Sequence, residues 1–565
     1  MRCSLFRISK LDIVLFSTLL INSMVAIASQ KSTANYQADV IVYGGTPSAI
    51  ISAVETAKSG KSVIVVSPDK HLGGMAASGL GYSDTGNKNT IGGLARDFYH
   101  RAFLHYQENT SWKWQNKSEF GNRGQVTSDT DTGSKAMDTE SATMWIFEPH
   151  VAEGIFETYV NENKIRVLRN ECLNRKTGVV KQSGKILSIK TLSGKIFKAK
   201  VFIDATYEGD LMAAAKVSFH VGREANTQYN ESYNGVHFGD TVHFNHFKQK
   251  IDPYKIPGNP KSGLLLGISS DKLHPNGTAD HKIQAYCYRV CMSENPQNMT
   301  PFPKPESYRP ERYELLLRLF AVAGTDWFNY YDRIPNRKTD TNNHGPFSSD
   351  YIGANYDYPN ASYAQRKVII KDHENYQKGL LYFASHDLRV PQELRDRLQK
   401  VGLAKDEFVD NGNWPYQPYI REARRMVGEF VMTDNHVLGK LPVPQAVAFG
   451  SYWLDTHNSQ RIVTSEGFVQ NEGDQGHPVP KPYPISYKSL TPKKSECTNL
   501  LVSVCVSATH IAYGSIRMEP VFMMLGQAAG QAACLAIDQK SAVQDIDYNA
   551  LKSGLQQKGA VLEFK

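Results

Sequence analysis

The glycine-rich turn Gly44-Gly45-Thr46-Pro47-Ser48 is the segment of the sequence best suited to hold a phosphate group. It follows an apolar run, Val40 to Val42, and precedes a stretch of small and apolar residues that ends at Gly60. Backbone N–H groups at the start of a helix point towards an anion, and the helix dipole favours its negative charge. Because strand, turn, helix and a second strand follow in order, the segment predicts a pyrophosphate seat of the dinucleotide-binding type.

The turn departs from the usual G-x-G-x-x-G pattern at Thr46 and Ala49, which stand where glycines are expected. Ala49 is small enough for close packing of helix on strand, whereas Thr46 is the more serious change. Ser67 occupies the position after the second strand where an acidic residue would hold a ribose hydroxyl, and Asp69 lies two residues later. The turn alone is therefore equally consistent with a Rossmann-like unit that binds no cofactor.

Three later segments have the composition of loops that approach a large planar ligand closely. Each also has an ordinary structural interpretation, as a glycine loop, a capped strand-to-helix turn and a tightly packed core helix. Paired glycines let the backbone pass near a ligand, and small residues do the same at the other two segments. The segments are His71 to Met75, Phe202 to Asp210, and Ser507 to Glu519 with the helix expected from about Val521 to Ile537.

The first 28 residues have the pattern of a secretory signal peptide. Arg2, Arg7 and Lys10 precede a mostly apolar run, and Ala26-Ile27-Ala28 is a small-x-small cleavage site. An uncleaved membrane anchor is the alternative. No later segment reads as a membrane span, so we expect a secreted or periplasmic protein with no stable membrane span after signal removal.

Charge and cysteine content exclude other classes of protein. The formal net charge of +8 is spread over 565 residues without a basic run, so nucleic acid is not an expected partner. Export permits disulfides, but six cysteines after the signal allow many pairings and the sequence selects none. Cys287 and Cys291 have no matching His/Cys pair, and we identify no metal site from spacing.

The distribution of apolar segments predicts an α/β fold in which both ends of the chain build one domain. Short apolar strands and glycine turns dominate residues 37–225, and the glycine- and alanine-rich character returns over 481–565. Residues 226–480 are rich in Tyr, Asn, Asp, His and Pro, with helical patches at 309–323 and 363–384. We therefore expect a Rossmann-like domain with an inserted mixed α+β substrate domain.

Taken in order, five segments resemble a secreted family of FAD-dependent oxidoreductases whose members are often labelled xanthan-lyase-like. The segments are GGTPSA, HLGGM, FIDATYEGD, YIREARRM and SATHIAYGSIRMEPVFMMLGQAAGQAA, and together they span nearly the whole mature chain. The resemblance implies a glutathione-reductase-type domain that binds FAD. Ser67, Ala49 and Tyr207 depart from the family pattern and affect the expected adenosine contacts. By position, the cofactor-binding residues are Gly44, Gly45, Thr46, Pro47, Ser48, Ser67, Gly73, Gly74, Met75, Asp204, Ala205, Thr206, Gly514 and Arg517.

Oxidation of a hydroxyl group by flavin needs a base to take the hydroxyl proton, and histidine is the usual one. His510, in the last motif, is the first candidate, with His71 and His237 behind it; a covalent histidyl-flavin bond at His71 is a further alternative. Arg421 and Arg425 have the spacing of one helical turn and could clamp a carboxylate. The alternative is that they pair with Glu422 or Glu429 as a structural network.

Three functions compete at this point. The first is oxidation of a C–OH (or C–N) bond of a sugar-like or small polar substrate by hydride transfer to FAD, with an unidentified electron acceptor. The second is a polysaccharide lyase acting on carbohydrate without flavin chemistry. The third is an FAD-binding protein with weakened catalysis.

Overall fold

The computed structural model describes residues 34–120, 136–240, 243, 245–326, 328 and 331–564. The signal peptide expected over residues 1–28 lies outside these ranges. The described helices are α2 (Pro47–Lys58), α3 (Gly93–Gln107), α4 (Lys117–Phe120), α5 (Pro149–Glu162), α6 (Asp210–Ala214), α7 (Asn226–Tyr229), α8 (Glu314–Ala323), α9 (Tyr363–His386), α10 (Gln392–Leu398), α11 (Asp434–Val437), α12 (His510–Ile516), α13 (Glu519–Asp538) and α14 (Tyr548–Gln557).

A five-stranded parallel sheet in the order β24-β10-β2-β3-β6 organises the domain built from the two ends of the chain. Its strands are β2 (Val40–Tyr43), β3 (Val63–Val66), β6 (Arg166–Leu168), β10 (Val201–Asp204) and β24 (Leu500–Val502). The central strands β2 and β10 are buried throughout, as expected of a parallel sheet covered on both faces. Because β24 pairs with β10, the C-terminal segment completes the sheet that the N-terminal segment begins.

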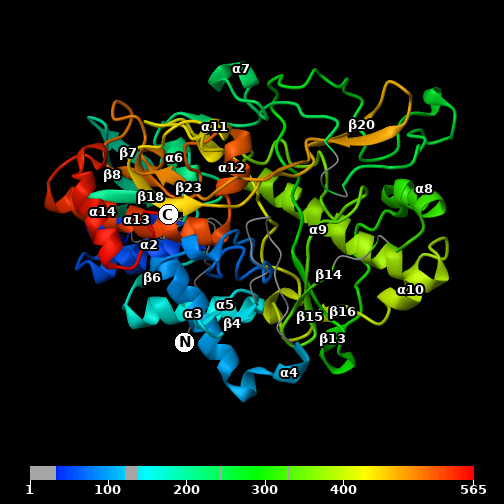
Figure 1. Ribbon diagram of the computed structural model, residues 1–565, viewed down its shortest axis with the longest axis horizontal. Coiled ribbons are helices and arrows are strands. Elements are labelled where there is room, and N and C mark those ends of the chain that lie inside the picture. Colours follow the sequence, from blue (N-terminus) through cyan, green and yellow to red (C-terminus); the bar gives the residue numbers. More distant parts are fainter. Residues whose placement is uncertain are drawn as a thin grey trace, which may run out of the picture.

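Helices α2 and α13 pack so closely that glycine is required between them. A Cβ atom at Gly526 would lie 2.5 Å from the carbonyl oxygen of Ser48, and one at Gly530 would lie 2.5 Å from that of Ser52. Both helices lie in the part of the molecule that contains the two chain ends, where Figure 1 shows blue and red ribbons together. The small residues of α13 thus bring the last segment of the chain onto the first helix.

Helix α13 is long and apolar enough to cross a membrane by length and composition, contrary to the sequence-based expectation that no later segment would be. Most of it is buried inside the molecule, where it contacts α2, α3, β10 and β18 (Ala446–Gly450). These contacts identify α13 as a helix of the core, and its burial there explains its apolar composition. No other described helix meets the same length and composition.

A second sheet extends this domain in the order β1-β9-β8-β7. Its strands are β1 (Asn35–Gln37), β7 (Val179–Gln182), β8 (Lys185–Lys190) and β9 (Ile196–Lys198). Strands β6, β8 and β10 confirm the short apolar strands that the sequence predicts within residues 37–225.

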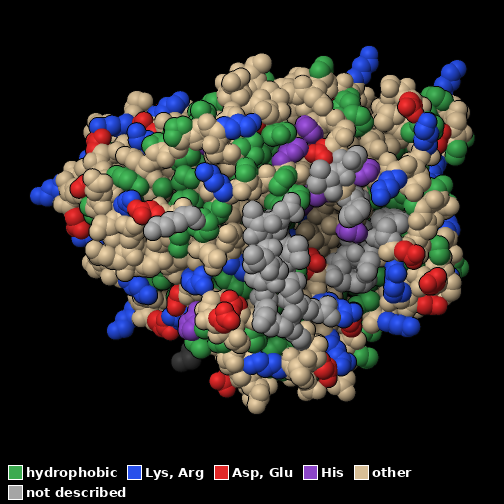
Figure 2. All heavy atoms as spheres, in the orientation of Figure 1, with side chains coloured by type: hydrophobic (Ala, Val, Ile, Leu, Met, Phe, Trp, Pro, Cys, Tyr) green, Lys and Arg blue, Asp and Glu red, His purple; other side chains and the backbone are tan. Residues whose placement is uncertain are grey.

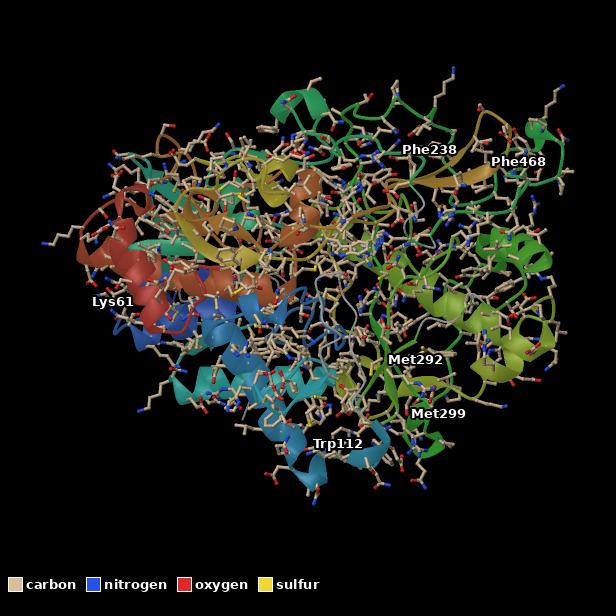
Figure 3. The ribbon with its side chains drawn as sticks, in the orientation of Figure 1. Lys61, Trp112, Phe238, Met292, Met299 and Phe468 are labelled. Atoms are coloured by element: carbon tan, nitrogen blue, oxygen red, sulfur yellow. The ribbon has the colours of Figure 1, made fainter. Side chains whose placement is uncertain are left out.

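The inserted segment forms its own sheet, in the order β13-β16-β12-β15-β14, and packs it against α9. Alternation along β12 (Val290–Ser293) explains this placement. Val290 and Met292 share a core with Leu381 of α9, whereas Cys291 belongs to the main core on the other side. In Figure 1 the insert occupies the green and yellow half of the molecule, and Figure 3 labels Met292 and Met299 there.

The remaining helices and strands are distributed over all three segments of the chain. Helices α8 and α9 confirm the helical patches predicted near 309–323 and 363–384. The exact domain boundaries stay a prediction. The strands are β4 (Met137–Asp138), β5 (Thr143–Met144), β11 (Phe219–His220), β13 (Met299–Thr300), β14 (Tyr331–Ile334), β15 (Lys338–Thr341), β16 (Gly402–Ala404), β17 (Arg425–Met426), β19 (Leu454–Thr456), β20 (Gln460–Val463), β21 (Val469–Glu472), β22 (Gln475–His477) and β23 (Tyr483–Ser486).

Candidate active site

Two adjoining cavities open at the carboxyl ends of β2, β3 and β10, and we call them together the cofactor crevice. Both are lined by Asp69 and Gln417, so one cavity continues into the other. Strands β3 and β10 lie on opposite sides of β2, and ligands of open α/β sheets bind at such a point. The lining of the crevice also includes Gly45, Thr46, His71, Gly74, Ser78, Thr206, Tyr207, Asp210, Arg366 and Tyr416.

Glycines keep the backbone of the crevice free of side chains. Gly44 has φ +140°, and a Cβ atom there would lie 2.5 Å from the carbonyl oxygen of Ala205. At Gly74, with φ +48°, a Cβ atom would lie 2.3 Å from Tyr207 Oη. The two glycine turns are joined directly, because Gly73 N–H donates to the carbonyl oxygen of Gly45 at 2.7 Å. The turn at residues 44–48 and the turn at 73–74 therefore form one bare backbone surface.

Thr46 is accommodated because its side chain caps helix α2. Its Oγ1 accepts a hydrogen bond from Ala49 N–H at 3.2 Å and donates to the Ala205 carbonyl at 2.7 Å. The backbone of Thr46 is extended, as is usual for an N-cap residue. Pro47 occupies the first helical position, which suits proline. The threonine side chain, which stands where glycine is expected, thus hydrogen-bonds the turn to the residue that follows β10.

Replacing Thr46 by alanine is expected to lower the free energy of unfolding by about 1 kcal/mol, the usual cost of losing an N-cap. Thr46→Ser keeps the hydroxyl and serves as the matched control. Chemical denaturation followed by circular dichroism measures both variants. Equal stability of the alanine variant and the wild type would contradict the capping role.

Ser67 does not line the crevice, which corrects its assignment as a cofactor contact. Its Oγ donates to the Asp69 carbonyl at 3.0 Å and accepts from Asp69 N–H at 3.1 Å. It also lies directly under Gly45, where a Cβ atom would approach Ser67 Oγ to 2.5 Å. The hydroxyl is therefore used in the turn, and Asp69 is the acidic residue that reaches the crevice wall.

The turn after β10 exposes Thr206 to the crevice and buries Asp204. Asp204 accepts hydrogen bonds from Thr206 N–H at 3.1 Å and Met212 N–H at 2.8 Å, and burial raises its pKa to about 6. The carboxylate of Asp204 therefore accepts a backbone hydrogen bond from the first turn of α6. Asp210 instead pairs with Arg366 at 2.8 Å and Arg424 at 2.9 Å.

Several predicted cofactor residues act through the backbone or through packing. Met75 is fully buried, and its N–H donates to Tyr207 Oη at 3.0 Å. Ser48 Oγ donates to Ser503 Oγ at 2.8 Å, beside α13. Gly514 packs on β19, where a Cβ atom would lie 2.5 Å from the Asp455 carbonyl oxygen. None of these three side-chain positions lines the crevice.

A separate cavity, which we call the polar cavity, is lined mostly by residues of the insert. Asp84 and Arg517, the residue that follows α12, complete its wall. It adjoins the second glycine turn, because Ser78 lines the crevice and a Cβ atom at Gly79 would lie 1.8 Å from the Arg289 carbonyl oxygen. The face in Figure 2 is hollowed near its centre, with purple histidine side chains around the hollow. The polar cavity is lined by Asp84, His243, Asn245, Arg289, Asn342, Asn343, His344, Tyr419, Tyr452, Asp455, His457, Asp474 and Arg517.

His457 is a wall residue of the polar cavity that a buried carboxylate orients. Its Nδ1 lies 2.8 Å from Asp350 Oδ2, so an Nδ1–H donates to that carboxylate and leaves Nε2 as the acceptor. Nε2 lies 3.8 Å from Oδ2 of Asp455, another wall residue. Burial, and then the charge of Arg421, lower the pKa of His457 below its ordinary value. The imidazole is therefore neutral at pH 7 and able to accept a proton.

Asp350 is held as a carboxylate by its two partners. Burial opposes ionisation, but Arg421, at 2.9 Å, and His457 lower the pKa of Asp350 to about 2. Arg421 also donates to the Ala285 carbonyl at 2.6 Å. This places Arg421, predicted as a catalytic residue, behind the cavity, where it fixes the residue that orients His457.

Arginines supply hydrogen-bond donors to the same cavity. Arg517 contacts Asp455 at 2.7 Å and donates to Tyr419 Oη at 2.9 Å. Arg289 bonds Asp340 through two nitrogens, both at 2.6 Å. Arg289 Nη1 and Arg517 Nε have no hydrogen-bond partner among the described residues. Buried donors of this kind are normally satisfied by a ligand or water.

His510, the residue predicted as the base, lines neither the crevice nor the polar cavity, and its Nε2 has no hydrogen-bond partner among the described residues. It is fully buried, its Nδ1 lies 2.8 Å from Glu422 Oε2, and its backbone N–H donates to Glu224 at 3.0 Å. Glu422 also contacts Arg425 at 2.8 Å. His510 thus belongs to a buried ionic network, because the motif places it at the enclosed start of α12 rather than at the cavity wall.

Arg421 and Arg425 do not lie on a helix. Residue 421 has no regular structure, and Arg425 belongs to the short strand β17. Arg425 bonds Glu224 at 2.5 Å and Glu422 at 2.8 Å. The structural network is therefore the correct alternative for this pair, and a shared carboxylate clamp is wrong.

The other two histidine candidates also have partners. His71 lines the crevice, where its Nδ1 lies 2.7 Å from Glu153 and its ring stacks on Tyr416 with centroids 3.5 Å apart. His237 is outside the lining of the polar cavity and lies near Asp240 and His477. Neither residue is placed to act as the base in the polar cavity.

Sequence reasoning missed His457, Asp455, Asp84 and Arg289 as cavity residues. Asp455 and His457 follow the Asp-x-His spacing, which puts two side chains on one face of an extended segment. This alternation was a usable signal. The partners Asp350 and Arg421 come from distant segments, so their part in the site required the structure.

The crevice fits a dinucleotide, which its glycine turns would hold. The bare glycine backbone at residues 44–45 and 73–74 is a cradle that side chains would fill. At the first turn of α13, Glu519 Oε2 is buried without a hydrogen-bond partner among the described residues, and burial raises the pKa of Glu519 to about 8. Glu519 Oε2 and Arg517 Nε, which have no hydrogen-bond partner among the described residues, suit the polar edge of a flavin.

Comparison with solved structures gives only short overlaps. The 3-ketosteroid-delta4-(5alpha)-dehydrogenase from Rhodococcus jostii RHA1 is 13% identical, with 33% of this chain and 50% of that chain covered at a TM-score of 0.20. A flavin monooxygenase from Stenotrophomonas maltophilia is 14% identical, with 30% and 38% covered at 0.17. THI4 from Thermovibrio ammonificans is 15% identical, with 39% and 76% covered at 0.21. These likenesses carry no argument about fold or activity, and the first two are covered over half their length or less.

The family comparison covers most of the chain. Among curated proteins no match to the sequence is found. The family described as FAD dependent oxidoreductase matches residues 39–555, which include every motif of the crevice and the whole insert. The chain therefore belongs to the FAD-dependent oxidoreductase family and is an FAD-binding oxidoreductase.

Proposed function

We propose that the protein oxidises a C–OH (or C–N) bond of a sugar-like or small polar substrate bound in the polar cavity. The observation that carries this proposal is His457, a neutral imidazole at the cavity wall with Asp350 fixed behind it at 2.8 Å. Bound FAD supplies the acceptor for the hydride. Gly44, Gly45 and Thr46, with the turn at 73–74, would hold its pyrophosphate.

His457 would remove the hydroxyl or ammonium proton of the substrate. The Nδ1–H bond to Asp350 holds the ring in one tautomer and orientation, so that Nε2 carries the lone pair. As Nε2 takes the proton, the carboxylates of Asp350 and Asp455 stabilise the positive ring. A well-placed base of this kind typically contributes about 10²–10⁴-fold to the rate.

The lining of the polar cavity supports a substrate with many hydroxyl groups. Arg289 Nη1 is an unpartnered donor among the described residues, and Asn342 and Asn343 add amide donors and acceptors. Asp84 adds an acceptor beside Tyr452 Oη, at 3.2 Å. Such a set matches hydroxyls better than apolar groups, which is the basis for a sugar-like substrate.

Export is part of the proposal and rests on residues 1–28 alone. A signal peptide there would place the enzyme outside the cytoplasm, in the manner of the xanthan-lyase-like members it resembles. Its electron acceptor is not identified.

Activity is expected to fall on the acid side as His457 becomes protonated. Because its pKa is lowered from the ordinary value of about 6.5, kcat/KM should be constant at neutral pH and decline about tenfold per pH unit below that pKa. Initial rates over a pH series, with FAD occupancy checked at each point, measure the profile. An acid limb centred above pH 7 would contradict the assignment.

The substrate class can be tested by anaerobic titration of the purified protein with sugars, polyols and amines. We expect a flavin spectrum that bleaches with a sugar-like or polyol substrate. A lyase would give unsaturated sugar ends while the flavin stays oxidised. Bound FAD that no compound of the panel reduces would instead indicate a binding protein with weakened catalysis.

A further inference from the structure

Outside the crevice and the polar cavity, His237, Asp240 and His477 form a cluster of three metal-ligating side chains. One ligand atom from each lies within 4.8 Å of the others. His237 and Asp240 come from the loop that follows α7, and His477 ends β22. Figure 3 labels Phe238, between these loop residues, at the upper edge of the molecule. All three side chains are partly exposed, so an ion can reach them.

The separations suit a shared ion better than direct hydrogen bonds. Asp240 Oδ2 lies 3.8 Å from His237 Nε2 and 3.5 Å from His477 Nε2. Hydrogen bonds from nitrogen to oxygen are about 2.7–3.2 Å long. Ligands at about 2.0–2.1 Å from a tetrahedral Zn²⁺ lie about 3.4 Å from each other. The two separations from Asp240 are slightly wider than this, and all three ligand atoms lie within 4.8 Å of one another, so the cluster would close around a bound ion.

Neighbouring groups orient the histidine of β22. The His477 ring stacks on Tyr233, with centroids 3.9 Å apart, which limits its rotation. Gln475 Oε1 lies 3.2 Å from His477 Nε2 and is an oxygen available as a further ligand. The same distance also allows a hydrogen bond to Gln475, which is the competing explanation for the cluster.

A second cluster of similar composition shows what a site without an ion looks like. Glu148, His150 and Glu407 also converge, but Lys338 Nζ lies 2.8 Å from Glu148 and 2.6 Å from Glu407. The buried ammonium group supplies the positive charge there. In the first cluster the carboxylate Asp240 Oδ2 faces two imidazole nitrogens instead, His237 Nε2 at 3.8 Å and His477 Nε2 at 3.5 Å.

We propose that His237, Asp240 and His477 bind a divalent transition metal ion, with Zn²⁺ the best match to two imidazoles and one carboxylate. The ion would join the loop at 237–240 to β22. His243 follows this loop and lines the polar cavity, where it lies 3.2 Å from Asp474. The metal would therefore stabilise the loop and strand that carry one wall of that cavity.

The test is the zinc content of the full mature protein with FAD bound. Protein freed of metal by a chelator is dialysed against Zn²⁺, and bound zinc is measured by mass spectrometry with and without His237→Gln or His477→Gln. We expect about one zinc ion per wild-type chain and an affinity at least about 10–100-fold lower in either variant. Zinc should also raise the Tm of the wild type but not the Tm of either cluster variant.

Exposed His274 provides the matched control, because His274→Gln removes a histidine of the same insert without touching the cluster. It should bind zinc like the wild type. The flavin spectrum reports that each variant is folded, and if one variant lacks it the other decides. No stoichiometric zinc in the wild type, or equal binding in both cluster variants, would overturn the proposal in favour of the Gln475 hydrogen bond.

Discussion

Replacing His457 by glutamine is expected to lower kcat by about 10²–10⁴-fold while FAD stays bound. Glutamine can keep a hydrogen bond to Asp350 but cannot take up a proton at Nε2. The cofactor crevice is built from other residues, so the flavin spectrum should not change. Steady-state turnover with an artificial electron acceptor measures the effect, once a substrate has been identified.

The comparison that makes this result decisive is His510→Gln. His510 is buried against Glu422, so replacing it should lower Tm. Its effect on kcat should be smaller than that of His457→Gln. A fall in kcat for His510→Gln as large as that for His457→Gln, at equal FAD content, would return the role of base to His510.

Replacing Gly44 by alanine is expected to remove most of the bound FAD and to destabilise the fold by about 1–3 kcal/mol. The new Cβ would lie 2.5 Å from the Ala205 carbonyl oxygen, and φ +140° is strained for any residue with a side chain. Relief requires β2 and β10 to separate at the point where the pyrophosphate would bind. Absorbance of the flavin per chain and denaturant unfolding measure the two effects.

Gly60→Ala separates strain from contact. Gly60 also has a positive φ, +78°, but a Cβ atom there meets no described atom within 4 Å. We expect it to lose some stability and keep its FAD. Equal FAD loss in the two variants would show that backbone strain alone, rather than the approach of β2 to β10, controls the cofactor site.

The parallel sheet and the glycine turns were predictable because their signals are local. Val40 to Val42 and Val63 to Val66 are short, continuous apolar runs separated by a helix-forming stretch, and this order specifies a βαβ unit. Gly44 and Gly73 mark positions that no other residue can occupy without contact. The capping role of Thr46 was not predictable, since it depends on the Ala205 carbonyl of a distant strand.

The proposed base, His457, could not be found from sequence for a physical reason. A histidine becomes a base through its neighbours, and those of His457 are Asp350 and, behind it, Arg421, which come from distant segments. His510 stands in the stronger motif, but it is not among the residues that line either cavity. Likewise, the spacing of Arg421 and Arg425 indicated a helix, whereas ion pairs with distant carboxylates hold this segment extended.

The most direct test of the account is anaerobic reduction of the bound flavin by a substrate deuterated at the reacting carbon. The account predicts that the flavin bleaches in a single turnover, and that deuterium slows the bleaching because the C–H bond breaks as the hydride leaves. Consumption of the substrate to an unsaturated product, with the flavin still oxidised and no isotope effect on its spectrum, would contradict it.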